Sequence, residues 1–321
     1  MNLNLLTDNL TSPALLFFVL GILAVRLKSD LEIPPSSSKF ISLYLLFSIG
    51  FKGGQELAHS HFTMEIAWSV LFGVFISCAI PFYSFFLLKR KLSIENSGAI
   101  AAAYGSVSAV TFVSAVSFLE LQKLEFSGHM VAVMALMEAP AIIIGVVLIR
   151  LYGGKKEAST SLRQVITHSF TNGSVLLILG SLIIGLLASE QQAQGIKPFT
   201  TDLFKGFLAI FLLDMGIVSG RKLGDFFKSG WFTAIFAVLI PLVNGCIVAQ
   251  LSGAITPDLG NRFMFAVLAA SASYIAVPAA MKIAVPKANP GIFLPMALAF
   301  TFPFNITFGM PIYLAIINAN F

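Results

Sequence analysis

A hydroxyl-rich stretch stands inside an apolar segment in the first half of the chain. The sequence YGSVSAVTFVSAVSFLE, residues 104–120, carries one glycine and five hydroxyl side chains, namely Gly105, Ser106, Ser108, Thr111, Ser114 and Ser117. Hydroxyls and free backbone N–H groups can bind a small anion, and hydroxyl and carbonyl oxygens can bind a hard cation. Serine is also common where membrane helices pack, because it lets backbones approach closely. This stretch alone is equally compatible with packing and with binding.

A second stretch, AASASYIAVP at residues 269–278, favours the binding interpretation. Its residues Ala270, Ser271 and Ser273 align with Gly105, Ser106 and Ser108 at a constant offset. Gly105 in the first stretch and Pro278 in the second each weaken a regular helix. We therefore expect two broken helices whose serines, Ser106, Ser108, Ser271 and Ser273, line a shared polar pocket.

Two carboxylates also lie within apolar runs, Glu138 and Asp214. A carboxylate inside a membrane is costly unless it is paired or ligated, so each is a candidate functional group. Glu138 precedes Pro140, which frees a carbonyl one turn earlier. Together they offer oxygen ligands to a small cation, and Thr301 and Asn305 would complete the shell; a structural hydrogen bond is the alternative for Glu138. Asp214 could instead pair with nearby basic residues.

Composition indicates that these segments lie in a lipid bilayer. The chain of 321 residues is 57% hydrophobic and only 11% charged, with a mean hydropathy of +0.89. A bilayer needs about 20 apolar residues per helix, and such runs recur along the whole chain without the period-two alternation of a barrel. We predict an all-α integral membrane protein with ten transmembrane helices, near residues 12–27, 38–52, 65–88, 98–118, 128–151, 174–189, 200–218, 229–252, 260–281 and 289–317.

Basic residues predict the orientation of these helices. With the N-terminus outside, all but five of the 20 Lys and Arg residues fall on the inner side, the exceptions being Lys52, Lys123, Lys197, Lys205 and Arg262. This distribution predicts a multi-pass plasma membrane protein, in bacteria an inner membrane protein, with both termini outside. The net charge of +5 then reflects topology and requires no nucleic-acid partner. The start of the chain lacks a basic n-region, so we expect the first span to be retained.

The two halves of the chain resemble each other. Gly50 and Gly54 align with Gly216 and Gly220, and Pro140 aligns with Pro303, at offsets close to that of the serine stretches. These matches predict a five-helix repeat over residues 1–152, a cytoplasmic linker over residues 153–173 and a second repeat over residues 174–321. Because five is odd, the second repeat enters the membrane from the opposite side, and inverted repeats typically bind substrate where their broken helices meet.

Other chemistry is not indicated. Cys78 and Cys246 lie in different spans and read as packing residues, and the HSH sequence at residues 59–61 is too small a constellation for a transition-metal site. The chain has no P-loop, dinucleotide fingerprint or zincin motif, so it is not expected to be an enzyme or to need a cofactor. Any energy input would come from an ion gradient.

Three segments carry a resemblance to a known family. GSVSAVTFVSAVSFLE, then MEAPAIIIGVVL, then AASASYIAVPAAMKIAVPKANPGIFLPMALAF resemble the sodium-dependent bicarbonate transporters of cyanobacterial type. The resemblance implies an elevator-type movement, a homotrimer, a PII-type regulatory protein on the cytoplasmic face, and bicarbonate bound beside sodium. It implies Thr111 as a further pocket residue, and Glu138 stands at a family Asp. Tyr274 and Val110 depart from the family pattern, at an Asp and a Ser.

The resulting hypothesis is a sodium-coupled symporter that imports bicarbonate or a similar small monoanion. Its substrate-binding residues are Gly105, Ser106, Ser108, Thr111, Ser271 and Ser273, and its sodium-binding residues are Glu138, Thr301 and Asn305. One alternative is the same fold carrying another small organic or inorganic anion with Na⁺ or H⁺. The other is a membrane sensor that binds an ion without transporting it.

Overall fold

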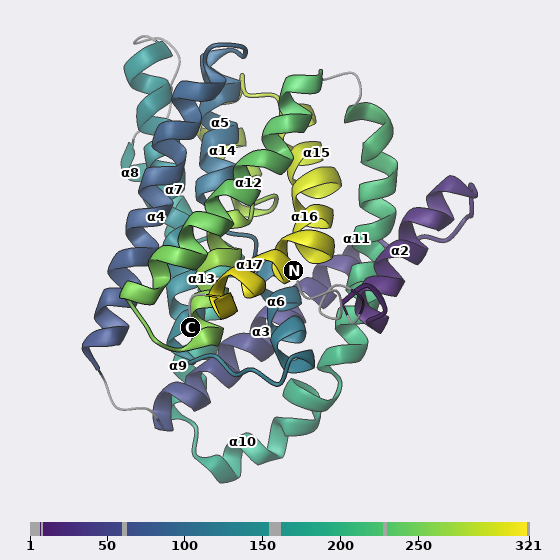
Figure 1. Ribbon diagram of the computed structural model, residues 1–321, viewed down its shortest axis with the longest axis vertical. Coiled ribbons are helices and arrows are strands. Elements are labelled where there is room, and N and C mark those ends of the chain that lie inside the picture. The colour runs from purple at the N-terminus through teal and green to yellow at the C-terminus, as the bar shows by residue number, and fades with distance from the viewer. Residues whose placement is uncertain (1–6, 8, 60–62, 154–161, 227–229, 320–321) are drawn as a thin grey trace.

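The protein is a bundle of long helices (Figure 1). The computed structural model describes residues 7, 9–59, 63–153, 162–226 and 230–319, which form helices, turns and extended links and contain no strand. The helices, with π-helical and 3₁₀ turns labelled η, are α2 (Pro13–Arg26), α3 (Pro35–His59), α4 (Met64–Leu88), α5 (Ile94–Gly105), α6 (Ala109–Leu121), α7 (His129–Gly153), α8 (Leu162–Phe170), α9 (Gly173–Leu187), α10 (Glu190–Lys197), η1 (Pro198–Asp202), α11 (Phe204–Phe226), α12 (Trp231–Leu251), η2 (Ser252–Ala254), α13 (Leu259–Ala270), α14 (Ala276–Ala284), α15 (Pro290–Pro295), η3 (Met296–Thr301), α16 (Phe302–Phe304), η4 (Asn305–Gly309) and α17 (Met310–Ala319).

Several helices begin where the sequence supplies a capping side chain. Ser93 precedes α5 and accepts a hydrogen bond from the Asn96 N–H, and Asp258 does the same for α13 with the Asn261 N–H. Such caps satisfy N–H groups that have no partner within the helix. They mark the N-terminal ends of α5 and α13, the two helices that lead into the serine stretches.

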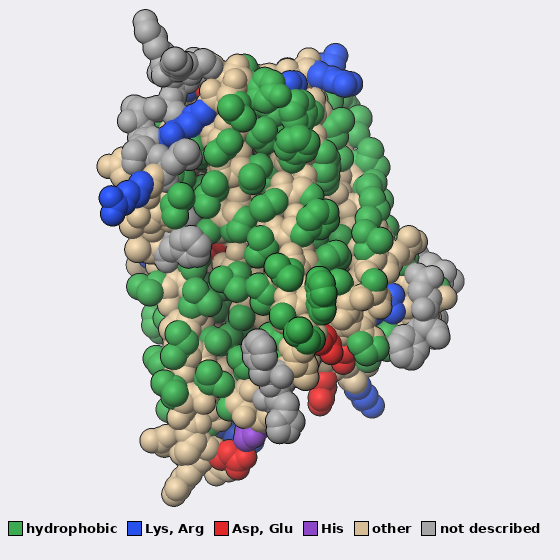
Figure 2. Space-filling model, turned by 90° about the vertical axis from the view of Figure 1, so that its left-hand side faces the viewer, with side chains coloured by type: hydrophobic (Ala, Val, Ile, Leu, Met, Phe, Trp, Pro, Cys, Tyr) green, Lys and Arg blue, Asp and Glu red, His purple; other side chains and the backbone are tan. Residues whose placement is uncertain are grey.

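The outer surface is that of a membrane protein. Apolar side chains cover most of the face in Figure 2, and charged side chains lie mainly toward its two ends. Six helical stretches of the described residues are long and apolar enough to cross a bilayer, and α2, α9 and α13 are shorter apolar helices. The predicted all-α membrane protein is therefore confirmed at this level.

Helices occupy each of the ten predicted ranges, and two of these ranges are interrupted at the serine stretches. The structure also contains helices that the sequence analysis did not predict. Helix α8 lies within the predicted linker, where it contacts α7 and α14, and π-helical turns η3 and η4 interrupt the last span. The polar tract at residues 154–161, with Lys155 and Lys156, lies outside the described residues, as do Lys228 and residues 60–62.

Close glycine contacts join two pairs of helices. Gly21 of α2 packs against Gly216 of α11, and Gly54 of α3 packs against Gly185 of α9. A Cβ added to any of these four would collide with the opposing backbone. Small residues allow membrane helices to approach this closely, which increases dispersion contacts between them. Two of the glycines that the repeat analysis aligned, Gly54 and Gly216, thus lie at close helix contacts, one in α3 and the other in α11.

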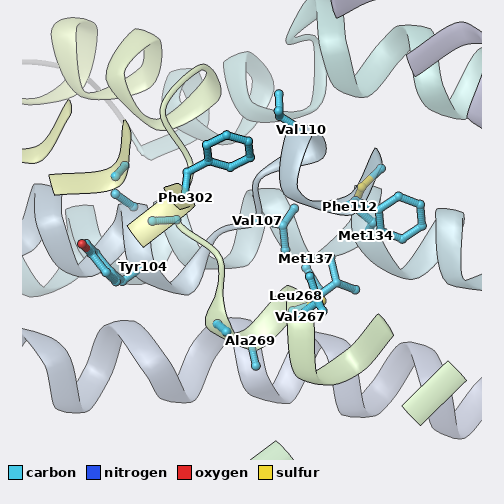
Figure 3. Close-up of a cluster of buried hydrophobic side chains, with 14 of the residues drawn as sticks. Tyr104, Val107, Val110, Phe112, Met134, Met137, Val267, Leu268, Ala269 and Phe302 are labelled. Carbon is cyan, nitrogen blue, oxygen red and sulfur yellow. The ribbon is translucent and has the colours of Figure 1, made fainter. Parts of the chain in front are cut away.

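The interruptions themselves lie in the buried core. Figure 3 shows Tyr104 and Val107, which flank the end of α5, in one cluster of buried side chains with Leu268 and Ala269 at the end of α13. All four side chains are at least 96% buried. Both interruptions therefore lie against each other and away from the lipid-facing surface.

Candidate functional site

The first interruption has a simple local cause. Helix α5 ends at Gly105, and Ser106 to Ser108 are extended before α6 begins at Ala109. The Ser108 Oγ accepts a hydrogen bond of 3.1 Å from the Thr111 N–H, which makes Ser108 the N-cap of α6. Gly105 lies against the ring of Pro81 in α4, where a Cβ would collide with that ring. Glycine therefore allows α4 to pack directly against the break.

The second interruption repeats this arrangement in the other half of the chain. Helix α13 ends at Ala270, and α14 begins at Ala276 after a non-helical segment. The Ser271 Oγ donates to the Leu268 carbonyl at 2.8 Å, and the Ser273 Oγ accepts from the Val277 N–H at 3.4 Å. Both serines are buried. Serine again satisfies the backbone groups that the interrupted helix leaves without partners.

Reciprocal hydrogen bonds join the two interruptions. The Ser108 N–H donates to the Ser271 Oγ at 3.0 Å, and the Ser273 N–H donates to the Ala103 carbonyl at 2.8 Å. Each interruption thus supplies a backbone donor to the other. Residues separated by about half the chain are thereby brought into direct contact, whereas the sequence analysis expected the four serines to line a shared pocket.

A small cavity with a volume of about 20 Å³ opens beside this junction. Ser108 and Ser273 line it from the two interruptions, Glu138 lines it from α7, and Tyr274 closes one side. We call it the serine cavity. It brings together hydroxyl groups, the N-terminal end of α6 at Ser108 and Ala109, and one carboxylate, so it presents groups suited to an anion and to a cation.

Glu138 is a carboxylate without a protein partner. Glu138 is half-buried on α7, and among the described residues it forms no hydrogen bond and no ion pair. A half-buried acid in this state is costly to a membrane helix unless a cation or proton accompanies it. Its position in the serine cavity is therefore suited to the cation role predicted for it.

Ser106 is the other polar group without a partner. Its side chain is fully buried, and its Oγ forms no hydrogen bond within the described structure. Most buried hydroxyls in proteins are hydrogen-bonded, so an exception needs an explanation. Ser106 lies two residues from the cavity-lining Ser108, which is consistent with the predicted substrate-binding role.

The structure does not bring Thr301 and Asn305 to Glu138. The Thr301 Oγ1 donates to the Ala237 carbonyl at 2.7 Å and lies 2.7 Å from the Tyr104 hydroxyl. The Asn305 Nδ2 donates to the Ala270 carbonyl at 2.7 Å and its Oδ1 accepts from Tyr313. Neither residue lines the serine cavity. Both instead hold the ends of α5 and α13, and Thr111 is likewise buried behind the cavity wall.

Asn244 is a structural residue at the site that the sequence analysis missed. Its Nδ2 donates to the Ala269 carbonyl at 3.3 Å, and its Oδ1 accepts a hydrogen bond from Tyr83. Asn244 and Asn305 thus satisfy adjacent carbonyls at the C-terminal end of α13, as a helix end in lipid requires. An isolated asparagine within the apolar sequence IPLVNGCIV was the signal that could have identified it.

A wider cavity of about 420 Å³ lies next to the serine cavity. It is lined by Lys39, Ser42, Asp214 and Arg221, and we call it the vestibule. Asp214 accepts a hydrogen bond of 2.5 Å from the Ser38 hydroxyl; it also interacts electrostatically with Arg221, which forms an ion pair of 3.5 Å with Glu32. Asp214 therefore belongs to the vestibule and lies apart from Glu138.

Comparison with known proteins identifies a family. The chain matches the model of the Na⁺-dependent bicarbonate transporter superfamily over residues 13–318. No curated protein matches the chain. The match includes both interruptions, Glu138 and the vestibule, so the whole site lies within the region that the family shares.

Proposed function

The chain belongs to the Na⁺-dependent bicarbonate transporter superfamily, and from this premise we propose that it is a sodium-coupled symporter that imports bicarbonate or a similar small monoanion. A transporter of this family is a multi-pass membrane protein and not an enzyme, and sodium is the expected coupling ion. The observation that carries the proposal is the serine cavity, where the junction of two interrupted helices faces a carboxylate that has no protein partner.

The anion binds at the junction of the interruptions in this proposal. The N-terminal end of α6 carries N–H groups and the positive end of the helix dipole, which favour a negative charge. Ser108 and Ser273 contribute hydroxyls at the cavity wall, and the Ser106 hydroxyl becomes hydrogen-bonded when an anion is present. Gly105 and Ser271 shape the junction, Gly105 by admitting Pro81 and Ser271 by holding the Ser108 N–H.

The cation binds first at Glu138. A sodium ion neutralises the carboxylate and lowers the cost of burying it, and the ion then attracts the anion to the same cavity. Binding of one ion thereby increases the affinity for the other, and thermodynamic linkage makes this coupling reciprocal. Thr301 and Asn305 support the ends of α5 and α13 behind the site.

The proposal includes an inverted repeat of residues 1–152 and 174–321 around the linker, both termini outside, and an elevator-type movement in the plasma membrane. The equivalent glycine contacts of α2 with α11 and of α3 with α9 support the repeat. With this orientation the vestibule opens to the cytoplasm. The homotrimer and the PII-type regulator remain predictions of the family resemblance.

Uptake of labelled bicarbonate into proteoliposomes tests the proposal. An alkaline buffer and short time points limit the contribution of CO₂, which crosses membranes unaided, and empty vesicles measure the remainder. We expect uptake that requires an inward sodium gradient and is lost in Ser106→Ala. The matched control is Ser117→Ala, which removes a hydroxyl from the same stretch but from a residue that lines a separate cavity.

Three other results would replace the proposal with a different one. Uptake that follows a proton gradient alone would identify H⁺ as the coupling ion. Sodium-dependent uptake of another small anion, without bicarbonate uptake, would change the substrate. Binding of sodium or bicarbonate without any flux would favour a membrane sensor.

A further inference from the structure

The serine cavity and the vestibule meet at only a few residues. Ser174, Tyr274 and Ile275 line both cavities. Ser174 lies on α9, and the other two lie at the end of the second interruption, just before α14. Of the three, Tyr274 has the largest side chain, so it occupies the greatest part of the boundary.

Two contacts position Tyr274 at this boundary. Its hydroxyl lies 3.7 Å from the Met215 Sδ on α11, which lines the vestibule. Its ring packs edge-on against Phe302, with ring centroids 6.5 Å apart and an interplanar angle of 68°. The ring contact thus orients the side chain, and a weak polar contact holds its end on the vestibule side.

These contacts differ in strength in a way that suits a movable side chain. A tyrosine hydroxyl on a thioether sulfur is a weak hydrogen bond, because sulfur is a poor acceptor. Replacing this contact by water or by a passing ion therefore has a small cost, whereas the Phe302 contact keeps the ring within the site. A side chain that served only to fill the core would have no reason to line two cavities at once, as Tyr274 does.

We propose that Tyr274 is the partition between the serine cavity and the vestibule, and that its side chain must leave Met215 for an ion to pass between them. This inference rests on the proposed function, because it assigns a step in the path of the transported ions. Tyr274 acts through its position, since it controls access from the vestibule to Glu138, Ser108 and Ser273 in the serine cavity.

Accessibility of cysteines to a thiol reagent tests the partition without requiring transport. The background is a chain with Cys78 and Cys246, its two cysteines, replaced by serine. Ala135→Cys reports on the serine cavity and Ser42→Cys reports on the vestibule. Each is reacted with a charged methanethiosulfonate reagent in the purified protein in lipid nanodiscs, with Tyr274 intact or replaced.

We expect Tyr274→Ala to increase the labelling rate of Ala135→Cys by about tenfold or more, because both the hydroxyl and the ring contacts are lost. The rate at Ser42→Cys should change less than about twofold, since this residue already lies on the open side of the boundary. Tyr274→Phe keeps the ring and should restore most of the protection at Ala135→Cys. Tyr274→Leu provides a second truncation if the alanine variant does not fold.

Equal labelling of Ala135→Cys with tyrosine and with alanine or leucine at position 274 would overturn the partition. So would labelling of Ala135→Cys as fast as Ser42→Cys while Tyr274 is intact. Failure of bicarbonate uptake leaves these rates unchanged, so the two proposals can fail independently.

Discussion

Two serines at equivalent positions of the interruptions should respond differently to the same substitution. Ser106→Ala removes a buried hydroxyl that has no hydrogen-bond partner, whereas Ser271→Ala removes the acceptor of the Ser108 N–H. A buried donor left without a partner costs about 1–3 kcal/mol. Ser271→Ala should therefore lower the free energy of unfolding by about that amount, and Ser106→Ala should leave it unchanged or raise it.

Bicarbonate uptake should show a different pattern from stability. A hydrogen bond to a charged group contributes about 1.5–3 kcal/mol, so loss of the Ser106 hydroxyl should weaken the apparent bicarbonate affinity by about 10- to 150-fold. Ser271→Ala should also reduce uptake, because it releases the junction at which the anion binds. Thermal unfolding in nanodiscs measures the first effect, and concentration-dependent uptake in proteoliposomes measures the second.

A stable Ser106→Ala protein with normal uptake would refute the assignment of this hydroxyl to the substrate. Loss of stability in Ser106→Ala would refute the structural premise instead, since it would mean that the hydroxyl has a partner in the fold. Ser117→Ala is the control for both measurements and should behave as the unmodified protein.

Other perturbations test the cation site, the packing and the movement. Glu138→Gln should weaken the sodium dependence of uptake by removing the carboxylate charge, and an unchanged sodium curve would return Glu138 to a structural role. Gly105→Ala should destabilise the protein by about 1–3 kcal/mol through a clash with the proline ring of α4; Gly180→Ala, which meets no atom within 4 Å, should not, as thermal unfolding would show. Glu120→Gln should change stability by about 1 kcal/mol or less, because its ion pairs are partly exposed. It should nevertheless slow labelling of a vestibule cysteine, because those pairs join α6 to α3 and α11 in this conformation, in which the vestibule is open. Glu190→Gln, which removes the contact of α10 with His59 on α3, is the control and should leave that rate unchanged.

The sequence was sufficient for features that follow from local rules. Apolar length located the long helices, although not α8, and the two serine stretches located the two interruptions. Ser108 then became an N-cap, as serine beside a new helix start commonly does. These features could be predicted because each depends on a few neighbouring residues and on the need to satisfy backbone groups within lipid.

The three-dimensional partners of the polar residues could not be predicted in the same way. Thr301 and Asn305 align with the region of Glu138, yet π-helical turns η3 and η4 give the last span its own local geometry, and both residues bind carbonyls instead. Tyr274 was recognised as a departure from a family pattern, but its place between two cavities depends on α11, which lies about 60 residues earlier in the chain. Side-chain direction at an interruption is set by packing between distant helices, and no local period encodes it.

The junction of the interruptions also limits how the site can move. The Ser108 N–H is bonded to Ser271 and the Ser273 N–H is bonded to Ala103, so separating the two interruptions would leave two buried donors without partners. Opening the site by pulling its two halves apart is therefore unfavourable. Movement against α2, α3, α9 and α11 breaks none of these bonds, although it must break others, among them the hydrogen bond from Ser219 on α11 to the Leu298 carbonyl and the ion pairs of Glu120 with Lys52 and Lys205. Moving the site as a unit keeps the junction of the two interruptions intact, which is the physical argument for the elevator-type movement that we propose.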